Sequence, residues 1–502
     1  MSQADDFSEL DYQFYSALTP KERYQKIQEP DTSENVRALL FYQQGQLLAD
    51  DQRYEEAVAS FDQAVQLKPG YYRVWLARAS ALRNLERDEE AIESCDRALA
   101  IHPDRHVVWH RRGISLHNLG RYEEAVENYD HALEIAPGFC TAWYNRGLSL
   151  EKLDRNEEAI ASYDRILQID PEYARAWRNR GDVFLKLGQH QAAITSYYRA
   201  LELGFKERAI WRNLGRALKA IGDYEEALES YNRWVQLQPD DYHAWKEQAA
   251  ILSGLRRYPE AIASYDRALE IKPDAHLLWS LRTLTLAKMD LYEEALDSCD
   301  HALTVKPDEF SHWRIKVLLL KELNRYEEEV ESCDRALELN PDDSELWSLR
   351  AFALRKLHRD EKAVESYDQA IALDPDNYKL RHQRGLALRK LGRTEAAIAE
   401  LNYALELRPD YYPATRSKLF LLLTTGWIFT YFTDRKPLIE REKLLTDLRR
   451  VLDGFVKTKL PTLIVLALMV LSGTHSQVVA LAIAGVFLLI TVASDLITES
   501  RQ

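Results

Sequence analysis

The stretch RYEEAVASFDQAVQLKP at residues 53–69 returns at residues 121–137 as RYEEAVENYDHALEIAP. Within each copy the apolar residues recur three and four positions apart, which is the spacing of one buried helix face. Glutamates fill the first turn, where the helix dipole favours negative charge. The repetition therefore predicts an amphipathic helix that recurs at a fixed period, and the period decides the architecture.

Three residue types follow a period of 34 residues along the chain. The prolines are Pro69, Pro103, Pro137, Pro171, Pro239, Pro273, Pro307, Pro341, Pro375 and Pro409. The tryptophans are Trp75, Trp109, Trp143, Trp177, Trp211, Trp245, Trp279, Trp313 and Trp347. Alanine recurs from Ala57 to Ala397 with Glu329 as the exception, and Phe205 fills the one gap among the prolines. Proline ends each unit because the residue before it is pushed out of the helical region.

This pattern resembles the tetratricopeptide repeat, a helix–turn–helix unit with Trp, Leu-Gly, Ala, an aromatic residue, Ala and Pro at set positions. One unit begins with WHRRG, from Trp109 to Gly113, and continues with Ala125, Tyr129, Ala132 and Pro137. The match covers residues 38–411, which hold eleven repeats of 34 residues in a long array of bacterial type. The resemblance implies an all-α fold, a right-handed superhelical solenoid whose concave groove is lined by the first helix of each repeat.

A few residues depart from the family pattern and put local packing in doubt. Trp234 replaces the second small alanine of the sixth repeat, and Arg381 stands where the last unit should have its tryptophan. The eighth position, usually glycine, holds Ala249, Thr283, Val317 and Ala351 in repeats seven to ten. Three cysteines, Cys95, Cys299 and Cys333, occupy a slot that is aromatic in other repeats, so we expect them to be buried in the core.

The segments outside the repeats are expected to be helical. Residues 1–37 read as an acidic N-terminal helical cap. Residues 412–433 begin like another first helix and then carry 15 uncharged residues, so they could cap the array or dip into lipid. Residues 434–459 set leucines at helical spacing beside basic residues, which suits an amphipathic juxtamembrane helix.

The C-terminal run at 460–494 contains no Asp, Glu, Lys or Arg in 35 residues. This length suits one transmembrane helix or a helical hairpin, with 495–502 as a polar tail. A buried helical pair within a soluble cap is the alternative. Basic residues precede the run, so we expect a membrane protein with its repeat domain on the cytoplasmic side.

Composition and motifs argue against catalysis and against nucleic acid as a ligand. The net charge is −14, whereas phosphate recognition depends on clustered Lys and Arg. The sequence contains no phosphate-binding glycine loop and no motif of a metalloprotease or serine hydrolase, and the repeats leave little chain for a catalytic domain. We therefore expect no enzyme activity and no cofactor.

One histidine group could hold a metal. His106, His110 and His117 are spaced so that all three share one face of a helix. Three imidazoles could bind zinc, but no carboxylate or thiolate stands beside them in the sequence. A polar lining of the groove is the preferred interpretation.

Candidate partner-binding residues come from the resemblance, which places ligand contacts at positions 2, 5, 9, 12 and 13 of the first helix. Basic residues dominate these positions: Arg175, Arg178, Lys186, Arg212, Arg216, Lys219, Arg314, Lys321, Arg355, Lys356, Arg389 and Lys390, with His382 in the second cluster. They predict a basic groove that reads acidic or extended peptide segments. At positions 12 and 13 the alternative stays open, because cations near a helix C-terminus also offset its dipole.

These features together indicate a scaffold for protein–protein interaction, anchored in a membrane by its C-terminus. A first alternative is a soluble adaptor whose apolar tail docks onto a partner. A second is the assembly subunit of an enzyme complex.

Overall fold

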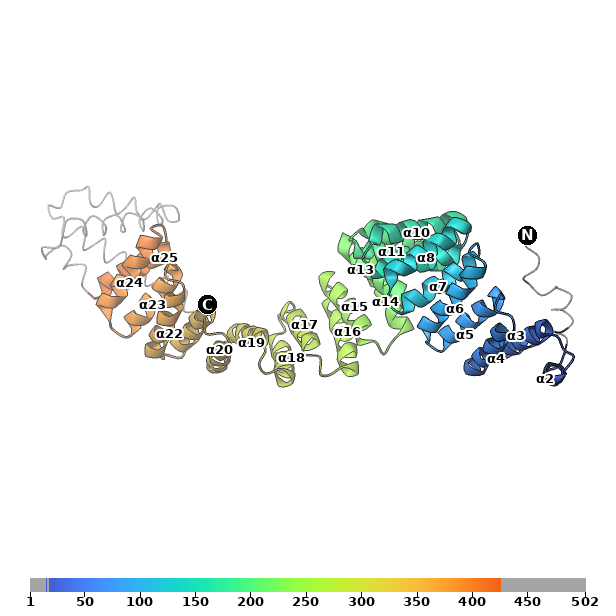
Figure 1. The fold of residues 1–502 in the computed structure, drawn as a ribbon. Coiled ribbons are helices and arrows are strands. Elements are labelled where there is room, and N and C mark those ends of the chain that lie inside the picture. Colours follow the sequence, from blue (N-terminus) through green and yellow to red (C-terminus); the bar gives the residue numbers. More distant parts are fainter. Residues whose placement is uncertain (1–14, 16–17, 426–502) are drawn as a thin grey trace, which may run out of the picture. The chain divides into compact units, whose positions relative to one another are not determined.

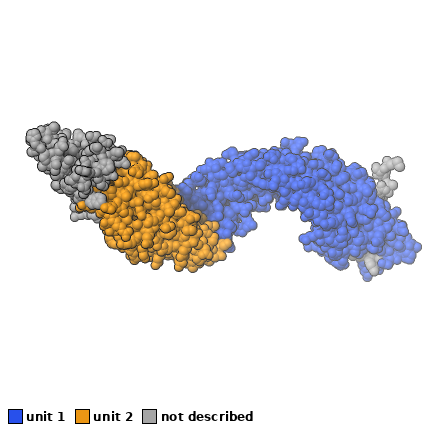
Figure 2. Space-filling model, turned by 60° about the vertical axis from the view of Figure 1, so that its left-hand side comes forward, with its two compact units in different colours: residues 1–255 blue, residues 256–502 orange. Residues whose placement is uncertain are grey.

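The computed structural model describes Tyr15 and residues 18–425, which fold into two compact units, 1–255 and 256–502 (Figures 1 and 2). The helices of unit 1 are α2 Pro20–Gln28, α3 Glu34–Asp50, α4 Tyr54–Leu67, α5 Tyr72–Asn84, α6 Asp88–Ile101, α7 His106–Asn118, α8 Tyr122–Ile135, α9 Cys140–Lys152, α10 Asn156–Ile169, α11 Ala174–Lys186, α12 His190–Glu202, α13 Arg208–Ile221, α14 Tyr224–Leu237 and α15 Tyr242–Gly254. Those of unit 2 are α16 Tyr258–Ile271, α17 His276–Ala287, α18 Tyr292–Val305, α19 Phe310–Glu322, α20 Tyr326–Leu339, α21 Ser344–Lys356, α22 Asp360–Leu373, α23 Tyr378–Lys390, α24 Thr394–Leu407 and α25 Tyr412–Thr424. The predicted all-α fold is confirmed, with no strand in the described residues.

Each repeat is a pair of antiparallel helices, which we call its A and B helices. The odd-numbered helices from α3 to α25 are A helices, and the even-numbered helices from α4 to α24 are B helices. In unit 1 every A helix from α3 to α13 packs on its own B helix and, through that B helix, on the next repeat. In unit 2 the same order holds from α17 to α23 (Figure 1). A single repeat leaves an apolar face open, so stacking supplies the core.

A ring-against-glycine contact sets the distance between the two helices of a repeat. A Cβ built on Gly147 in α9 would lie 2.7 Å from the Tyr163 ring of α10. Gly45, Gly113, Gly181 and Gly215 meet the ring of their own B helix in the same way. Glycine is therefore required at the eighth position wherever an aromatic ring fills the facing slot.

The cysteine repeats follow the opposite choice of volumes. Cys95, Cys299 and Cys333 are buried, which confirms the prediction. Their repeats carry Ala79, Thr283 and Val317 at the eighth position, where other repeats have glycine. A larger residue on the A helix thus accompanies a smaller one on the B helix, because the summed volume across the pair is what the packing holds constant.

The shared period of proline and tryptophan has a direct cause in hydrogen bonding. The indole Nε1 of Trp143 donates to the Pro137 carbonyl at 2.9 Å, and that of Trp177 donates to the Pro171 carbonyl at 2.8 Å. Six other tryptophans make the same bond to a proline six residues earlier: Trp75, Trp109, Trp245, Trp279, Trp313 and Trp347. This bond fixes the turn between repeats.

An arginine on most A helices ties together the B helices on either side of it. In α9, Arg146 Nε donates to Asp130 of α8 at 2.6 Å and its Nη1 donates to Ser162 of α10 at 2.8 Å. Arg78, Arg112, Arg180, Arg282, Arg350 and Arg384 occupy the equivalent position and pair with an Asp of the preceding B helix. The sequence analysis missed this fourth repeated position, which joins successive repeats by bidentate contacts.

The ends of the array contain α2 and α25. A capping box starts α2, where the Thr19 side chain and the Glu22 backbone and side chain bond each other. At the other end α25 packs on α24 and α23, and Leu419, Leu421 and Leu422 are buried there. None of the helices in residues 18–425 combines the length and the apolar composition needed to cross a bilayer. The predicted segments 434–459, 460–494 and 495–502, and the end of 412–433, lie outside the described residues.

Candidate functional site

The A-helix face comprises the side chains at positions 2, 5, 9, 12 and 13 of the A helices, counted from residues 38, 72 and every 34 residues onward. In unit 1 the predicted basic residues of this face lie on α11 and α13. Three of them are neutralised by acids: Arg178 pairs with Asp182 at 3.2 Å, Lys186 with Asp154 at 2.5 Å and Lys219 with Glu247 at 3.3 Å. The exposed Arg175, Arg212 and Arg216 form no ion pair within the described residues.

Asp182 is the centre of a hydrogen-bond network in repeat five. Its Oδ1 accepts from the Tyr197 hydroxyl and from Asn213 Nδ2, both at 2.8 Å, while its Oδ2 faces Arg178 Nε. Tyr197 is fully buried, so the carboxylate gives its hydroxyl the partner that burial demands. Burial, and then the charge of Asp182, raise the pKa of Tyr197 and keep it protonated as a donor.

A pocket of about 870 Å³ opens on the same face between α13, α14 and α15. Its lining residues are Arg212, Arg216, Lys219, Ala220, Tyr224, Tyr231, Trp234, Asp241, His243 and Glu247. The Arg212 guanidinium lies 6.0 Å from the centre of the Trp234 ring, close enough for a cation–π contact. Trp234, which we singled out as a departure from the small-residue pattern, is buried beneath it.

Glu247 is the acidic residue of this pocket that is already engaged. Its Oε1 lies 3.1 Å from Lys246 and its Oε2 lies 3.3 Å from Lys219. Burial disfavours the ionised carboxyl, but Lys219 and Lys246 outweigh it and lower the pKa of Glu247. The pocket therefore keeps the charges of Arg212 and Arg216 uncompensated.

The second predicted cluster lies in unit 2 on α19, α21 and α23. Arg314 pairs with Glu345. Arg355 donates to the Gln383 side-chain carbonyl at 2.6 Å, and Arg389 stacks 5.3 Å from the Phe420 ring centre. Lys321, Lys356 and Lys390 make no ion pair among the described residues, so this cluster also keeps an excess of positive charge.

His382 lies inside this second cluster and is buried. Its Nε2 lies 3.0 Å from the Ser417 hydroxyl, and burial together with Arg355 and Arg389 lowers its pKa to about 4. It is therefore neutral at physiological pH and adds no charge to the cluster.

The three histidines of α7 make separate contacts. His110 is buried with its Nε2 2.9 Å from Asn145 Nδ2, and His117 Nδ1 lies 2.7 Å from the Ser149 hydroxyl. The His106 ring packs edge-on against Phe139 at 5.1 Å. Within the part of the chain that the structure describes, no three His, Cys, Asp or Glu side chains gather as a metal site would require.

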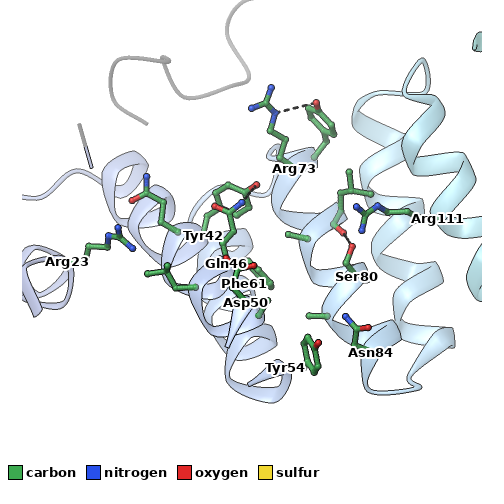
Figure 3. Close-up of a pocket in the computed structure, with 17 residues that line it drawn as sticks. Arg23, Tyr42, Gln46, Asp50, Tyr54, Phe61, Arg73, Ser80, Asn84 and Arg111 are labelled. Atoms are coloured by element: carbon green, nitrogen blue, oxygen red, sulfur yellow. Dashed lines mark hydrogen bonds between the residues drawn. The ribbon is translucent and has the colours of Figure 1, made fainter. Parts of the chain in front are cut away.

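A further pocket of about 790 Å³ lies on the A-helix face at the N-terminal end of unit 1 (Figure 3). Tyr42, Gln46 and Asp50 of α3 face Arg73, Ser80 and Asn84 of α5 across it, and Arg111 of α7 enters from the next repeat. Burial, and then Arg83, lower the pKa of Arg111. The sequence analysis missed this pocket because it searched the face for charge, whereas these positions hold mainly amides, hydroxyls and aromatic rings.

Several parts of the chain match tetratricopeptide families. Residues 42–106, 110–174, 144–207 and 212–276 match one tetratricopeptide repeat description, residues 353–392 match a TPR repeat, and residues 378–411 match another tetratricopeptide repeat. The chain belongs to the tetratricopeptide repeat family. Within the array, residues 326–357 also match the protein prenyltransferase alpha subunit repeat. A comparison with curated proteins finds none that matches this chain.

Solved structures share the fold of this tetratricopeptide array. YrrB, a TPR protein with an unusual peptide-binding site, is 24% identical with a TM-score of 0.36, over 38% of this chain and 98% of YrrB. PilF of Pseudomonas aeruginosa is 18% identical with a TM-score of 0.38, over 46% of this chain and 99% of PilF. A tetratricopeptide repeat protein from Parabacteroides merdae is 19% identical with a TM-score of 0.36, over 50% of this chain and 98% of that protein. At these identities the likeness concerns the fold alone.

Proposed function

We propose that this tetratricopeptide array is a non-enzymatic scaffold whose A-helix face binds acidic, extended segments of partner proteins. Arrays of this family are protein–protein interaction scaffolds. The observation that carries the acidic specificity is the group of exposed arginines without an acid partner, Arg175, Arg212 and Arg216, on two consecutive A helices. Arginine presents a planar fork of donors that suits a carboxylate, so an acidic segment supplies the missing acceptors.

The structure of the face also limits which residues contribute to binding. Arg178, Lys186 and Lys219 are held by acids of the array, so a ligand would have to compete with those ion pairs. In unit 2, Arg355 and Arg389 meet an amide and a ring instead of a carboxylate. They form a second place where an acidic segment would gain charge-assisted hydrogen bonds.

The test is binding of a short fluorescent peptide rich in Asp and Glu to the full-length protein, compared with its Asn and Gln counterpart. Changing Arg175, Arg212 and Arg216 together to Glu should abolish binding. The matched control changes Arg165, Arg199 and Arg233 to Glu, since these arginines bond Gln or Glu residues on the B helices and lie off the A-helix face. Equal loss in both triple variants would mean that net charge, and not the face, determines binding.

We propose further that the chain is attached to a membrane by residues 460–494, with the repeats on the cytoplasmic side. Support comes from the absence of Asp, Glu, Lys and Arg in that run and from the basic residues before it. Extraction of membranes with alkaline carbonate separates this proposal from the soluble adaptor, because an adaptor washes off while a spanning segment remains. Recovery of the chain in the wash would refute the anchor.

A further inference from the structure

Repeats five and six place the same tyrosine in two different chemical settings. In repeat five, Tyr197 of α12 donates its hydroxyl to Asp182 of α11. In repeat six, Tyr231 of α14 occupies the equivalent slot and is equally buried at 0% exposure. Its hydroxyl has no hydrogen-bond partner. A buried hydroxyl without a partner costs about 1–3 kcal/mol, so repeat six holds an unused donor.

The missing acceptor has an identifiable cause. The ninth position of the A helix holds Asp182 in repeat five but Arg216 in repeat six. The fifth position is arginine in both, Arg178 in α11 and Arg212 in α13. Repeat six therefore retains the donors that hold a carboxylate in repeat five and has a second arginine where the carboxylate would be.

Arg212 and Arg216 are four residues apart on α13 and line the 870 Å³ pocket together with Tyr231. Like charges at this spacing repel and destabilise a helix by a few tenths of a kcal/mol. An anion placed between them relieves the repulsion and accepts from both guanidinium groups. Trp234 lies under the Arg212 guanidinium and positions it over the pocket.

We propose that this pocket of repeat six binds one carboxylate of a partner segment, held by Arg212, Arg216 and the Tyr231 hydroxyl. The inference rests on the proposed function and assigns a specific subsite within it. Asp182, with its contacts to Arg178 and Tyr197, is the internal counterpart of the bound ligand group. A carboxylate fits better than a neutral amide because all three groups are donors and a carboxylate is acceptor-only. Glu247 does not fill the role, since its two oxygens face Lys219 and Lys246.

The test uses the full-length protein and a fluorescent peptide of alternating Glu and Ala with an amidated C-terminus. Tyr231→Phe should weaken binding about tenfold, because it removes one charge-assisted hydrogen bond while the ring that packs on Gly215 stays. Arg216→Asp should abolish binding, because it recreates the arrangement of repeat five and fills the site with an internal carboxylate. The matched control, Tyr197→Phe, loses its bond to Asp182 and should bind the peptide as the unchanged protein does.

A second peptide identifies the source of the carboxylate. If a Gln-for-Glu peptide with a free C-terminus binds in the same Tyr231-dependent way, the site takes a terminal carboxylate; if only the Glu peptide does, it takes a side chain. Thermal melting should show that Tyr231→Phe is at least as stable as the unchanged protein, which excludes unfolding as the cause of weaker binding. Binding that survives Tyr231→Phe and Arg216→Asp but is weakened by Arg175→Glu would overturn the subsite and leave the proposed function standing. No binding of the Glu peptide by the unchanged protein would overturn both.

Discussion

Glu329 of α20 interrupts the repeated alanines and lies at 0% exposure, with neither carboxyl oxygen hydrogen-bonded. Burial raises its pKa from the ordinary 4.5 to about 7, against the opposing charge of Lys321. Below pH 4.5 the carboxyl is protonated in the folded and the unfolded chain. As the pH rises from 4.5 to 7, the unfolded chain releases this proton while the folded chain keeps it. Unit 2 therefore becomes less stable over this interval.

The size of this effect can be worked out from the pKa. Each pKa unit corresponds to about 1.4 kcal/mol, so the rise from 4.5 to about 7 costs about 3 kcal/mol above pH 7. Glu329→Ala removes that cost and gives up two buried methylenes, worth about 1.6 kcal/mol. We expect the variant to be more stable than the unchanged protein by about 1 kcal/mol at pH 8 and less stable by about 1 kcal/mol at pH 5.

Hydrogen exchange of peptides from α20, corrected for intrinsic rates at each pH, measures this local free energy. Glu331→Ala is the matched control, because Glu331 lies on the same helix but is exposed. It should leave the pH dependence unchanged. Glu329→Gln should flatten the pH dependence, since the amide does not titrate. If Glu329→Ala changes stability by the same amount at pH 5 and pH 8, the carboxyl is not desolvated in the fold and the reasoning is wrong.

Two more predictions concern the repeated contacts. Gly147→Ala brings a methyl group to 2.7 Å from the Tyr163 ring and should cost about 1–3 kcal/mol in a thermal melt. Gly138→Ala, with nothing within 4 Å, should be neutral, and adding Tyr163→Cys to Gly147→Ala should recover stability if the Ala79–Cys95 pairing is a true compensation. Trp177→Phe loses its 2.8 Å bond to the Pro171 carbonyl and should cost about 1 kcal/mol in urea denaturation. Trp211→Phe should cost less, because Phe205 replaces the proline there and the Trp211 indole has no hydrogen bond among the described residues; equal costs would refute the role of the bond.

The repeated residues could be predicted because each performs the same task in every unit. Period alone placed the helices, the proline turns and the buried cysteines, since a residue such as Cys299 inherits its surroundings from the slot it fills. The same regularity hid the arginine at Arg146 and its equivalents, because charged residues on a helix are expected at the surface and their partners lie in other helices. Neither partner of such a pair is marked in the sequence.

The candidate site could be predicted only in part, because its charge depends on pairs and not on single residues. Position and charge selected Arg178 and Arg212 equally, yet Asp182 neutralises the first and nothing neutralises the second. The pocket beside Tyr42 escaped notice for the complementary reason, since amides and hydroxyls become a surface only when two A helices face each other.

Repeats five and six show how a repeat array can produce a binding site without a new fold. The buried tyrosine belongs to the core and has to be present in each repeat, whether or not its hydroxyl is satisfied. An acid at the ninth position of the A helix satisfies it internally, as Asp182 does for Tyr197. A base at that position, as in Arg216, leaves the hydroxyl for an acceptor from outside and adds a charge that attracts one. The stability cost stays small because it falls on one repeat, while neighbouring repeats keep their own packing.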